Sequence, residues 1–432
     1  MEETYSLYLK NISELVTCSN SSKKPKRGEE LLDAHVISDG AVLVQGDKIK
    51  MVGTTAALES YIKSPGRKIK IERELSLKGM TLAPGFVDPH THLVFAGSRE
   101  NEFAMRVCGK TYLEILEAGG GILNTLKNVR INSEDELFAE ANARVEQAFM
   151  HGTTSMEIKS GYGLDFESEI KSLKVIERLS KKSKCTVVST YMGAHAIPPE
   201  YKAKREEYIE LMINKVIPYV AEHKLAKFND VFVEEGVFSA AEGRRILEAG
   251  KRHGLVPKVH ADEITSCGGA ELAAEIGAIS ADHLLMATDS GFEKMRDAGV
   301  TAVCLPGTLY SLLSKSYLSF DRLLKLKVPL ALATDANPGS NMCLNMQAAI
   351  NQAVCLMKTP PAAAFNMATI NSAHAVGIAG ERGSVEAGKY ADFVIFEGRS
   401  LNYMPYCYGT NLVKYIVKNG VLHKINSEYV AM

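Results

Sequence analysis

The chain has 432 residues, more than a single hydrophobic core usually serves, so we expect either one unusually large domain or a main domain with a smaller companion. Hydrophobic residues make up 46% and charged residues 23%, an ordinary globular composition that excludes a disordered or fibrous chain. The 50 basic and 51 acidic residues leave a formal net charge of −1, which argues against nucleic acid or a polybasic membrane surface as a partner.

Other features of the composition indicate a cytoplasmic protein with no membrane partner. The apolar stretches are shorter than a membrane span, and the first residues, MEET, lack the basic-then-apolar pattern of a signal peptide. The eight cysteines are scattered and form no CxxC pair, so we expect reduced thiols. We interpret the short basic cluster at residues 23–27 as a solvated loop.

Both ends of the chain consist of short predicted strands. Those near the N-terminus are residues 5–16, 41–46, 48–52 and 74–80, followed by a predicted break at Pro84 and Gly85. Those near the C-terminus are residues 383–385, 391–396 and 413–421. Because chain ends often lie close together in a domain, we predict one small β-sandwich domain built from residues 1–83 and 376–432.

The middle of the chain alternates between apolar runs and helical patterns. The predicted strands are residues 86–92, 153–159, 186–190, 230–233, 256–260, 278–283, 301–305 and 329–334. The clearest helical patterns cover residues 167–179, 206–223, 240–253 and 267–276. This alternation predicts an α/β fold, a (β/α)₈ TIM-like barrel over residues 84–375. A doubly wound open sheet is the alternative, although no GxGxxG follows the first strand.

Histidines and an aspartate lie where several predicted strands end. The first strand ends in His90-Thr91-His92, and side chains two apart on a strand point to the same face. His260, His283 and Asp335 end the fifth, sixth and eighth predicted strands. Active sites of such barrels form at this end of the strands. Imidazole and carboxylate ligands suit zinc or ferrous iron with a position left for water, so the sequence predicts a metal site.

Two longer motifs resemble the amidohydrolase superfamily. Residues 84–92 (PGFVDPHTH) resemble its first metal-binding motif, and residues 383–393 (GSVEAGKYADF) resemble the return of its chain into the small β domain. Within the superfamily, the chain is similar to the imidazolonepropionase family of histidine degradation. The segments that carry this resemblance are residues 95–100 (FAGSRE), 118–122 (AGGGI), 157–163 (EIKSGYG), 260–263 (HADE) and 334–340 (TDANPGS).

The resemblance implies a hydrolase that opens the cyclic amide of 4-imidazolone-5-propanoate to give N-formimidoyl-L-glutamate. It implies one divalent or trivalent metal ion, zinc or iron, and a homodimer. The implied ligands are His90, His92, His260 and Asp335. His283, Asp335 and Glu263 are the implied catalytic residues: His283 for the attacking water or the oxyanion, Asp335 for proton transfer, and Glu263 for the ring nitrogens. Which of His283 and Asp335 acts as general base stays open.

The substrate carries a carboxylate, and Arg99 is the predicted residue that binds it, because a guanidinium can hold a carboxylate with two hydrogen bonds. The resemblance implies further substrate-binding residues: Tyr112, Tyr162, His195, Glu263, Asn337, Gly339 and Ser340. The glycines at 119–121 are interpreted either as a lid hinge or as a plain flexible loop.

The fourth predicted strand carries no lysine at its end, where binuclear relatives place a carbamylated lysine, so we predict a single metal ion. Lys159 ends the second strand, a different place. Glu234 has two interpretations, a ligand of a second ion and a hydrogen-bonded structural carboxylate, and we favour the second. The alternative functions are another mononuclear amidohydrolase, such as a nucleobase-type deaminase, and a non-catalytic scaffold on the same fold. Arg99 with Tyr162 favours a carboxylated substrate, which a nucleobase is not.

Overall fold

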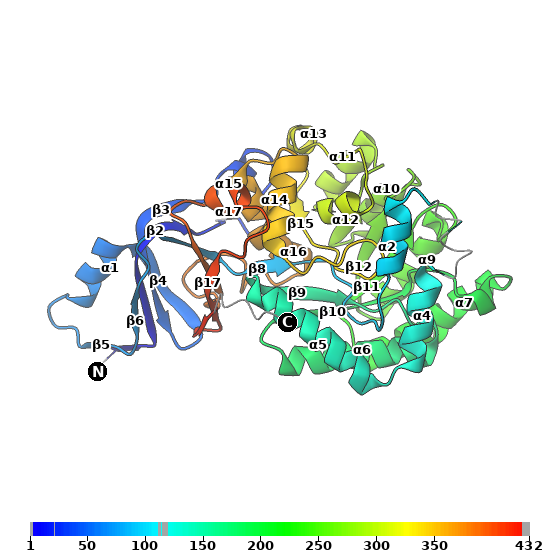
Figure 1. Ribbon diagram of the computed structural model, residues 1–432, viewed down its shortest axis with the longest axis horizontal. Helices are drawn as coiled ribbons and strands as arrows, with labels where there is room; N and C mark the ends of the chain where they lie inside the picture. The colour runs from blue at the N-terminus through cyan, green and yellow to red at the C-terminus, as the bar shows by residue number, and fades with distance from the viewer. Residues whose placement is uncertain (1–2, 21, 111–113, 115–119, 426–432) are drawn as a thin grey trace.

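A parallel eight-stranded sheet forms the core of the computed structural model, which describes residues 3–20, 22–110, 114 and 120–425. The strands follow one another in sequence order across the sheet, and each pairs in parallel with the next. They are β8 (Phe86–Asp88), β9 (Thr153–Lys159), β10 (Thr186–Ala194), β11 (Phe228–Val233), β12 (Val256–Ala261), β13 (Ser280–His283), β14 (Thr301–Cys304) and β15 (Leu330–Leu332). Figure 1 shows helices around these strands, and the predicted (β/α)₈ barrel is confirmed.

Helices connect the barrel strands and pack against their outer faces. α5 and α9 each begin at a capping box, in which a serine and the glutamate three residues later satisfy each other's free backbone N–H groups. None of the helices formed by the described residues combines the length and apolar character needed to cross a bilayer. The helices are α2 (Glu100–Val107), α4 (Ile122–Ile131), α5 (Glu134–Met150), α6 (Phe166–Lys182), α7 (Arg205–Leu211), α8 (Ile217–Glu222), α9 (Ala240–Arg252), α10 (Gly269–Ile276), α11 (Asp289–Ala298), α12 (Pro306–Ser311), α13 (Phe320–Leu326), α14 (Met346–Leu356), α15 (Pro361–Asn366), α16 (Ser372–Ala375) and α17 (Tyr403–Tyr406).

The barrel closes through the segments that follow β8 and β15. Thr91 forms a parallel bridge with Ala336, and the His92 backbone N–H donates to the Ala336 carbonyl oxygen at 2.9 Å. The Asp335 N–H donates in the same way to the His90 carbonyl oxygen at 3.1 Å. Closure of the barrel therefore brings the predicted ligands from the first and last strands side by side.

A second eight-stranded sheet contains strands from both ends of the chain and lies at the left of Figure 1. Its central strand, β7, pairs with the N-terminal β2 on one side and with the C-terminal β16 on the other. A small two-stranded sheet of β1 and β5 accompanies it, and α1 (Thr55–Ile62) packs against β3 and β4. The strands are β1 (Glu3–Tyr5), β2 (Leu7–Val16), β3 (Val36–Gln45), β4 (Lys48–Thr54), β5 (Ile69–Ile71), β6 (Glu74–Ser76), β7 (Met80–Pro84), β16 (Phe393–Glu397), β17 (Val413–Lys418) and β18 (Val421–Lys424).

Some local predictions were wrong. The predicted break at Pro84 and Gly85 falls at Gly85, which separates β7 from β8, while Pro84 is still the last residue of β7 and pairs with Phe393 of β16. Residues 383–385 form no strand. The cluster at 23–27 is not wholly solvated, because Lys26 is 2% exposed. Its Nζ donates to Asn366 Oδ1 at 3.1 Å and to the Asp33 carbonyl oxygen at 2.8 Å, which replaces the hydration lost on burial.

Candidate metal centre

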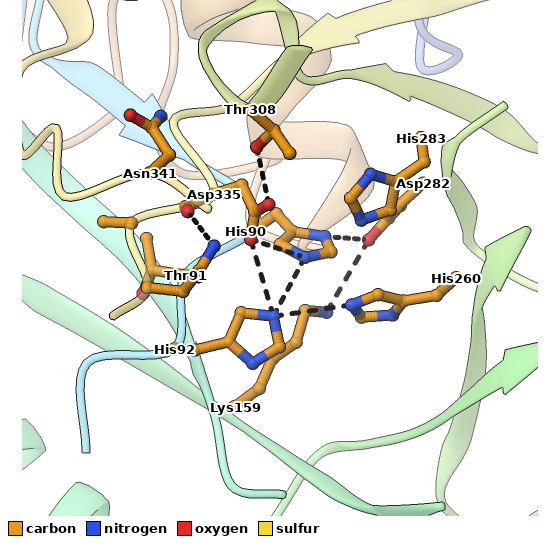
Figure 2. A network of polar contacts seen from close by, with 12 residues as sticks. His90, Thr91, His92, Lys159, His260, Asp282, His283, Thr308, Asp335 and Asn341 are labelled. Carbon is orange, nitrogen blue, oxygen red and sulfur yellow. Dashed lines mark hydrogen bonds and ion pairs between the residues drawn. The ribbon is translucent and has the colours of Figure 1, made fainter. Parts of the chain in front are cut away.

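Four side chains from separate parts of the barrel meet at its C-terminal end (Figure 2). His92 Nε2 lies 3.2 Å from His90 Nε2 and 3.4 Å from His260 Nε2. Asp335 Oδ1 lies 3.5 Å from His90 Nε2 and 3.6 Å from His92 Nε2. Nitrogen and oxygen donors that bind one tetrahedral ion at about 2.0–2.1 Å lie about 3.3 Å from one another. The four separations given above are close to this value, and the structure groups His90, His92 and Asp335 as one possible ligand set and His90, His260 and His283 as another.

The protonation of these imidazoles also fits a metal ion. Burial lowers the pKa of His90 and of His92 well below the ordinary histidine value, so both rings are neutral. His90 Nδ1 lies 2.6 Å from the buried Asp282 Oδ2, so Nδ1 carries the proton and Nε2 presents a lone pair. Lone pairs on neighbouring donor atoms repel each other in the absence of a cation, and a bound metal ion removes this repulsion.

The backbone at three strand ends adopts the left-handed conformation that residues other than glycine rarely occupy. The φ angle is 49° at Asp262, 75° at His283 and 53° at Asp335. Asp262 is held there because its carboxylate accepts hydrogen bonds from the backbone N–H groups of Gly269 and Ala270 (3.1 and 2.8 Å) at the start of α10. At His283 and Asp335 the turn falls on the candidate residue itself, and at Asp262 it falls two residues after the ligand His260.

His283 and Glu263 face each other beside the ligands. One ring nitrogen of His283 lies within 4.8 Å of donor atoms of His90 and His260, and its Nδ1 lies 3.5 Å from Glu263 Oε1. Burial lowers the pKa of His283 to about 4 and raises that of Glu263 to about 7. His283 is therefore neutral near pH 7, while Glu263 is close to its midpoint and can either accept or donate a proton.

Thr308 fixes the orientation of Asp335. Its Oγ1 donates a hydrogen bond of 2.6 Å to Asp335 Oδ2, while Oδ1 faces the imidazoles (Figure 2). Burial raises the pKa of Asp335, so this carboxylate takes up a proton more readily than an exposed one. One oxygen thus points to the metal position, and the other has a fixed donor.

The comparison with known proteins identifies the family. Residues 81–424 match the Amidohydrolase family. The chain is 47% identical over 414 residues to the imidazolonepropionase of Shouchella clausii (strain KSM-K16), an alignment that covers 96% of this chain and 92% of that protein. The identity to the imidazolonepropionase of Geobacillus kaustophilus (strain HTA426) is 46%, with 96% and 97% covered. The chain belongs to the imidazolonepropionase family. It is a metal-dependent hydrolase with an amidohydrolase fold.

Solved structures of similar fold are more distant. An adenosine deaminase from Xanthomonas campestris with bound zinc superposes with a TM-score of 0.72 at 18% identity, covering 100% of this chain and 96% of that one. The Escherichia coli guanine deaminase has a TM-score of 0.70 at 16% identity, with 98% and 100% covered. At this identity the likeness concerns the fold alone.

Two of the aromatic residues that the family resemblance implies lie directly beside the metal centre. The His195 ring stacks on the His92 ring with centroids 5.1 Å apart, and the Tyr162 ring lies 5.8 Å from that of His92. His195 Nδ1 lies 3.0 Å from the Gly161 carbonyl oxygen, which fixes the ring. Burial raises the pKa of Tyr162, so its hydroxyl remains a hydrogen-bond donor at neutral pH.

Arg99 lies at the N-terminus of α2 and has a partner that the sequence reading did not identify. Its Nε donates to both carboxylate oxygens of Glu102 at 3.0 Å, and its Nη2 donates to Oε2 at 2.8 Å. A Cβ atom at Gly339 would lie only 2.3 Å from Arg99 Nη1, so the guanidinium passes directly over this glycine. Both residues line a cavity of about 670 Å³, together with Arg106. We call this cavity the mouth.

The remaining predicted binding residues fall into two groups. Asn337 is used within its own turn: its Oδ1 accepts from the Gly339 and Ser340 N–H groups, both at 2.8 Å, and its Nδ2 donates to Ser340 Oγ at 2.8 Å. Gly339 and Ser340 line the mouth. Tyr112 and Gly119 lie outside the described residues.

The sequence reading missed a group of buried charged residues below the ligands. They are Lys159, Lys258, Glu157, Asp230 and Asp282, and each side chain is 0% exposed. We call this group the charged floor. A signal was available, because charged residues in the middle of apolar barrel strands must face partners. Lys258 stands two residues before His260 on β12, so both side chains point to the same face.

Proposed function

We propose that this protein hydrolyses 4-imidazolone-5-propanoate to N-formimidoyl-L-glutamate. The observation that carries the proposal is the 44–47% identity to imidazolonepropionases over at least 96% of the chain. The reaction adds water across a cyclic amide: the water oxygen bonds to the carbonyl carbon, the carbon–nitrogen bond breaks, and the released nitrogen takes a proton. The product keeps all atoms of the ring together with those of the water.

We propose that His90, His92, His260 and Asp335 hold one divalent or trivalent ion, zinc or iron. Three neutral imidazoles and one carboxylate suit either metal, and the spacing of the donor atoms supports the assignment. In sites of this kind a bound ion supplies Lewis-acid chemistry, lowering the pKa of a water molecule from about 16 to about 7.

The protein groups move the protons. Asp335, whose pKa burial raises, takes a proton from the attacking water and returns it to the leaving nitrogen. His283 is neutral, and its nitrogen near the ligands donates a hydrogen bond to the carbonyl oxygen as that oxygen gains negative charge. Glu263, whose Oε1 lies 3.5 Å from His283 Nδ1, binds the ring nitrogens of the substrate and accepts a hydrogen bond from a substrate N–H when it is ionised.

Arg99 is proposed to hold the propionate carboxylate at the mouth. Glu102 occupies one edge of the guanidinium, so Nη1 is left to face Gly339 and the cavity. Tyr162, His195 and the 337–340 turn then surround the substrate between Arg99 and the ligands. The family resemblance implies that Tyr112 also binds the substrate.

Finer assignments follow from the same family. We propose that residues 84–375 form the catalytic domain, that residues 1–83 and 376–432 form the β domain, and that the protein is a cytoplasmic homodimer. Sedimentation at several protein concentrations tests the dimer independently of activity.

The decisive experiment is a turnover assay on the metal-loaded protein. Loss of the imidazolone ultraviolet absorbance with matching formation of N-formimidoyl-L-glutamate is expected. Adenosine and guanine serve as parallel substrates, because the similar solved structures include deaminases for them. Release of ammonia from a nucleobase without imidazolone turnover would overturn the proposal.

A further inference from the structure

The charged floor is organised around the ammonium of Lys159. Its Nζ lies 2.9 Å from Glu157 Oε1, 2.8 Å from Asp230 Oδ2 and 3.6 Å from Asp282 Oδ2. Glu157 and Lys159 come from β9, Asp230 from β11 and Asp282 from β13, so three strands direct carboxylates to one point inside the barrel. Burial alone would lower the pKa of Lys159, but these carboxylates raise it, so the ammonium stays charged.

Lys258 completes the floor from another side. Its Nζ donates to Glu157 Oε2 at 2.6 Å and to the Pro89 carbonyl oxygen at 3.0 Å, and it lies 3.7 Å from Asp282 Oδ2. Three carboxylates and two ammonium groups leave one negative charge on the floor. The pairing is what allows five charged groups to be buried together.

The floor is joined directly to two metal ligands. Asp282 Oδ2, which faces both lysines, is also the atom 2.6 Å from His90 Nδ1 (Figure 2). Asp230 Oδ2, which binds Lys159, lies 3.0 Å from His260 Nδ1. One carboxylate oxygen and one imidazole therefore separate the Lys159 ammonium from the metal position on each of these two paths.

Without the lysine, this arrangement would bind a cation. Carboxylate oxygens that converge in a buried site are the ligands that Mn²⁺ and similar hard ions prefer. Glu157, Asp230 and Asp282 would then be three such donors, with Lys258 as their only counter-charge among the described floor residues. A second ion there would draw Asp282 and Asp230 away from His90 and His260.

We propose that the Lys159 ammonium is a built-in cation that occupies the position a second metal ion would otherwise fill, and thereby limits the centre to one ion. It also keeps Asp282 and Asp230 available to orient His90 and His260. Lys159 is a positioning residue in this account, because it touches the partners of the ligands and not the reacting atoms. The inference rests on the metal site of the proposed function.

The test removes the charge and counts the ions. Wild type, Lys159→Met and the double variant Lys159→Met/Glu157→Gln are stripped with a chelator and dialysed against Mn²⁺ alone. We expect one bound Mn²⁺ in the wild type and two in Lys159→Met, with an electron paramagnetic resonance signal of two coupled ions. The double variant, which lacks one of the three carboxylates, should return to one.

Lys418→Met is the matched control, because Lys418 is also buried and pairs with a single carboxylate, Asp392, at 2.7 Å in the terminal sheet. It should bind one ion. Thermal unfolding provides a second readout if Lys159→Met is unstable: Mn²⁺ should raise its melting temperature more than that of the double variant.

The outcomes separate the two proposals. A wild type that binds no Mn²⁺ contradicts the metal site itself. A wild type with one ion and a Lys159→Met variant that also binds one, or that binds a second ion without spin coupling, contradicts the role of Lys159. So does a Lys159→Met protein that Mn²⁺ stabilises no more than it stabilises the double variant.

Discussion

The charged floor, which contacts the metal ligands directly, and the mouth, which is lined by α2 and the loops around it, differ in burial and in the pairing of their charges. The floor side chains are 0% exposed, and each contacts at least two polar or charged side chains inside the barrel. At the mouth, Phe103 is 48% exposed, and Arg99 takes its one strong partner from its own helix. The floor lies on barrel strands, whereas the mouth is lined mainly by α2, the loop before it and the segment after β15, with one residue each from α5 and α12.

This difference indicates that the floor positions the metal ligands and that the mouth binds the substrate. Each charged floor residue has an oppositely charged partner inside the barrel, and two of the floor carboxylates also contact ligand imidazoles, so the floor holds the ligands in position before substrate arrives. The mouth is lined by the charged residues Arg99, Arg106, Arg144 and Glu100, and Glu102 pairs with Arg99. The formal charge of these five groups is +1, which favours an anion. Changes near the floor should alter metal content and kcat, and changes at the mouth should alter KM.

The largest effect is expected for His260→Ala. Loss of one of the four donors should remove the metal and lower kcat by about 10⁴-fold or more. Metal analysis and the turnover assay measure both quantities on the same sample. His223→Ala is the matched control, because His223 is an exposed residue at the C-terminal end of α8 and should leave both unchanged. An active, metal-loaded His260→Ala protein would break the comparison.

Arg99→Ala should raise KM by about 100-fold while the metal content stays at the wild-type level, since a charge-assisted pair to the substrate carboxylate is lost. Steady-state kinetics with metal analysis tests this. Arg178→Ala removes an arginine on the outer helix α6 and should change neither. If Arg99→Ala lost its metal to the same degree as His260→Ala, the two regions would not be separate.

Glu263→Gln tests, through the pH dependence of kcat/KM, whether Glu263 takes part in the reaction in its ionised form. The wild-type kcat/KM should fall as the pH drops below about 7, because Glu263 becomes protonated. The variant should lose this acid limb and retain about one tenth to one hundredth of the plateau. The folded pKa is raised, so the protonated group stabilises the fold below about pH 4.5, and this stabilisation is lost as the pH rises through about 7. An unchanged pH profile in Glu263→Gln would assign the limb to another group.

The smallest effect is expected for Gly339→Ala. The added Cβ would meet Arg99 Nη1 at 2.3 Å, so the guanidinium must shift at the end of its flexible chain. We expect KM to rise by about 3- to 10-fold, corresponding to about 1 kcal/mol, with kcat and metal content unchanged. Gly236→Ala tests a more exposed glycine away from the mouth, and its φ of 77° adds backbone strain. A fall in kcat alone for Gly339→Ala would contradict its assignment to the mouth.

The sequence was sufficient to predict the barrel and the ligands because both depend on periodic signals. Strand and helix patterns alternate at the expected spacing, and His90, His92, His260, His283 and Asp335 all stand at strand ends, which parallel topology brings to one edge. The structure places all five together.

The sequence did not predict the charged floor, because that prediction requires knowing which side chains meet inside the barrel. Lys159 was set aside because it ends the second strand rather than the fourth, yet its ammonium reaches Asp230 on the fourth strand, β11. Spacing along the chain does not state which inward-facing residues of different strands share a layer. Arg99 was assigned a substrate role without its partner, although Glu102 three residues on is the spacing at which helix side chains meet.

The closing seam of the barrel has a consequence for how this protein can change. The Asp88 carboxylate accepts hydrogen bonds from the Thr334 backbone N–H at 3.1 Å and from Thr334 Oγ1 at 2.6 Å, and these bonds hold the two edges of the barrel together. Asp88 stands two residues before His90, and Thr334 stands one residue before Asp335. The residues that close the barrel and the residues proposed to bind the metal therefore lie in the same two short segments of the chain. A substitution in these stretches would disturb both barrel closure and the metal ligands. Substitutions that change the substrate are therefore better tolerated in α2 than where the barrel closes.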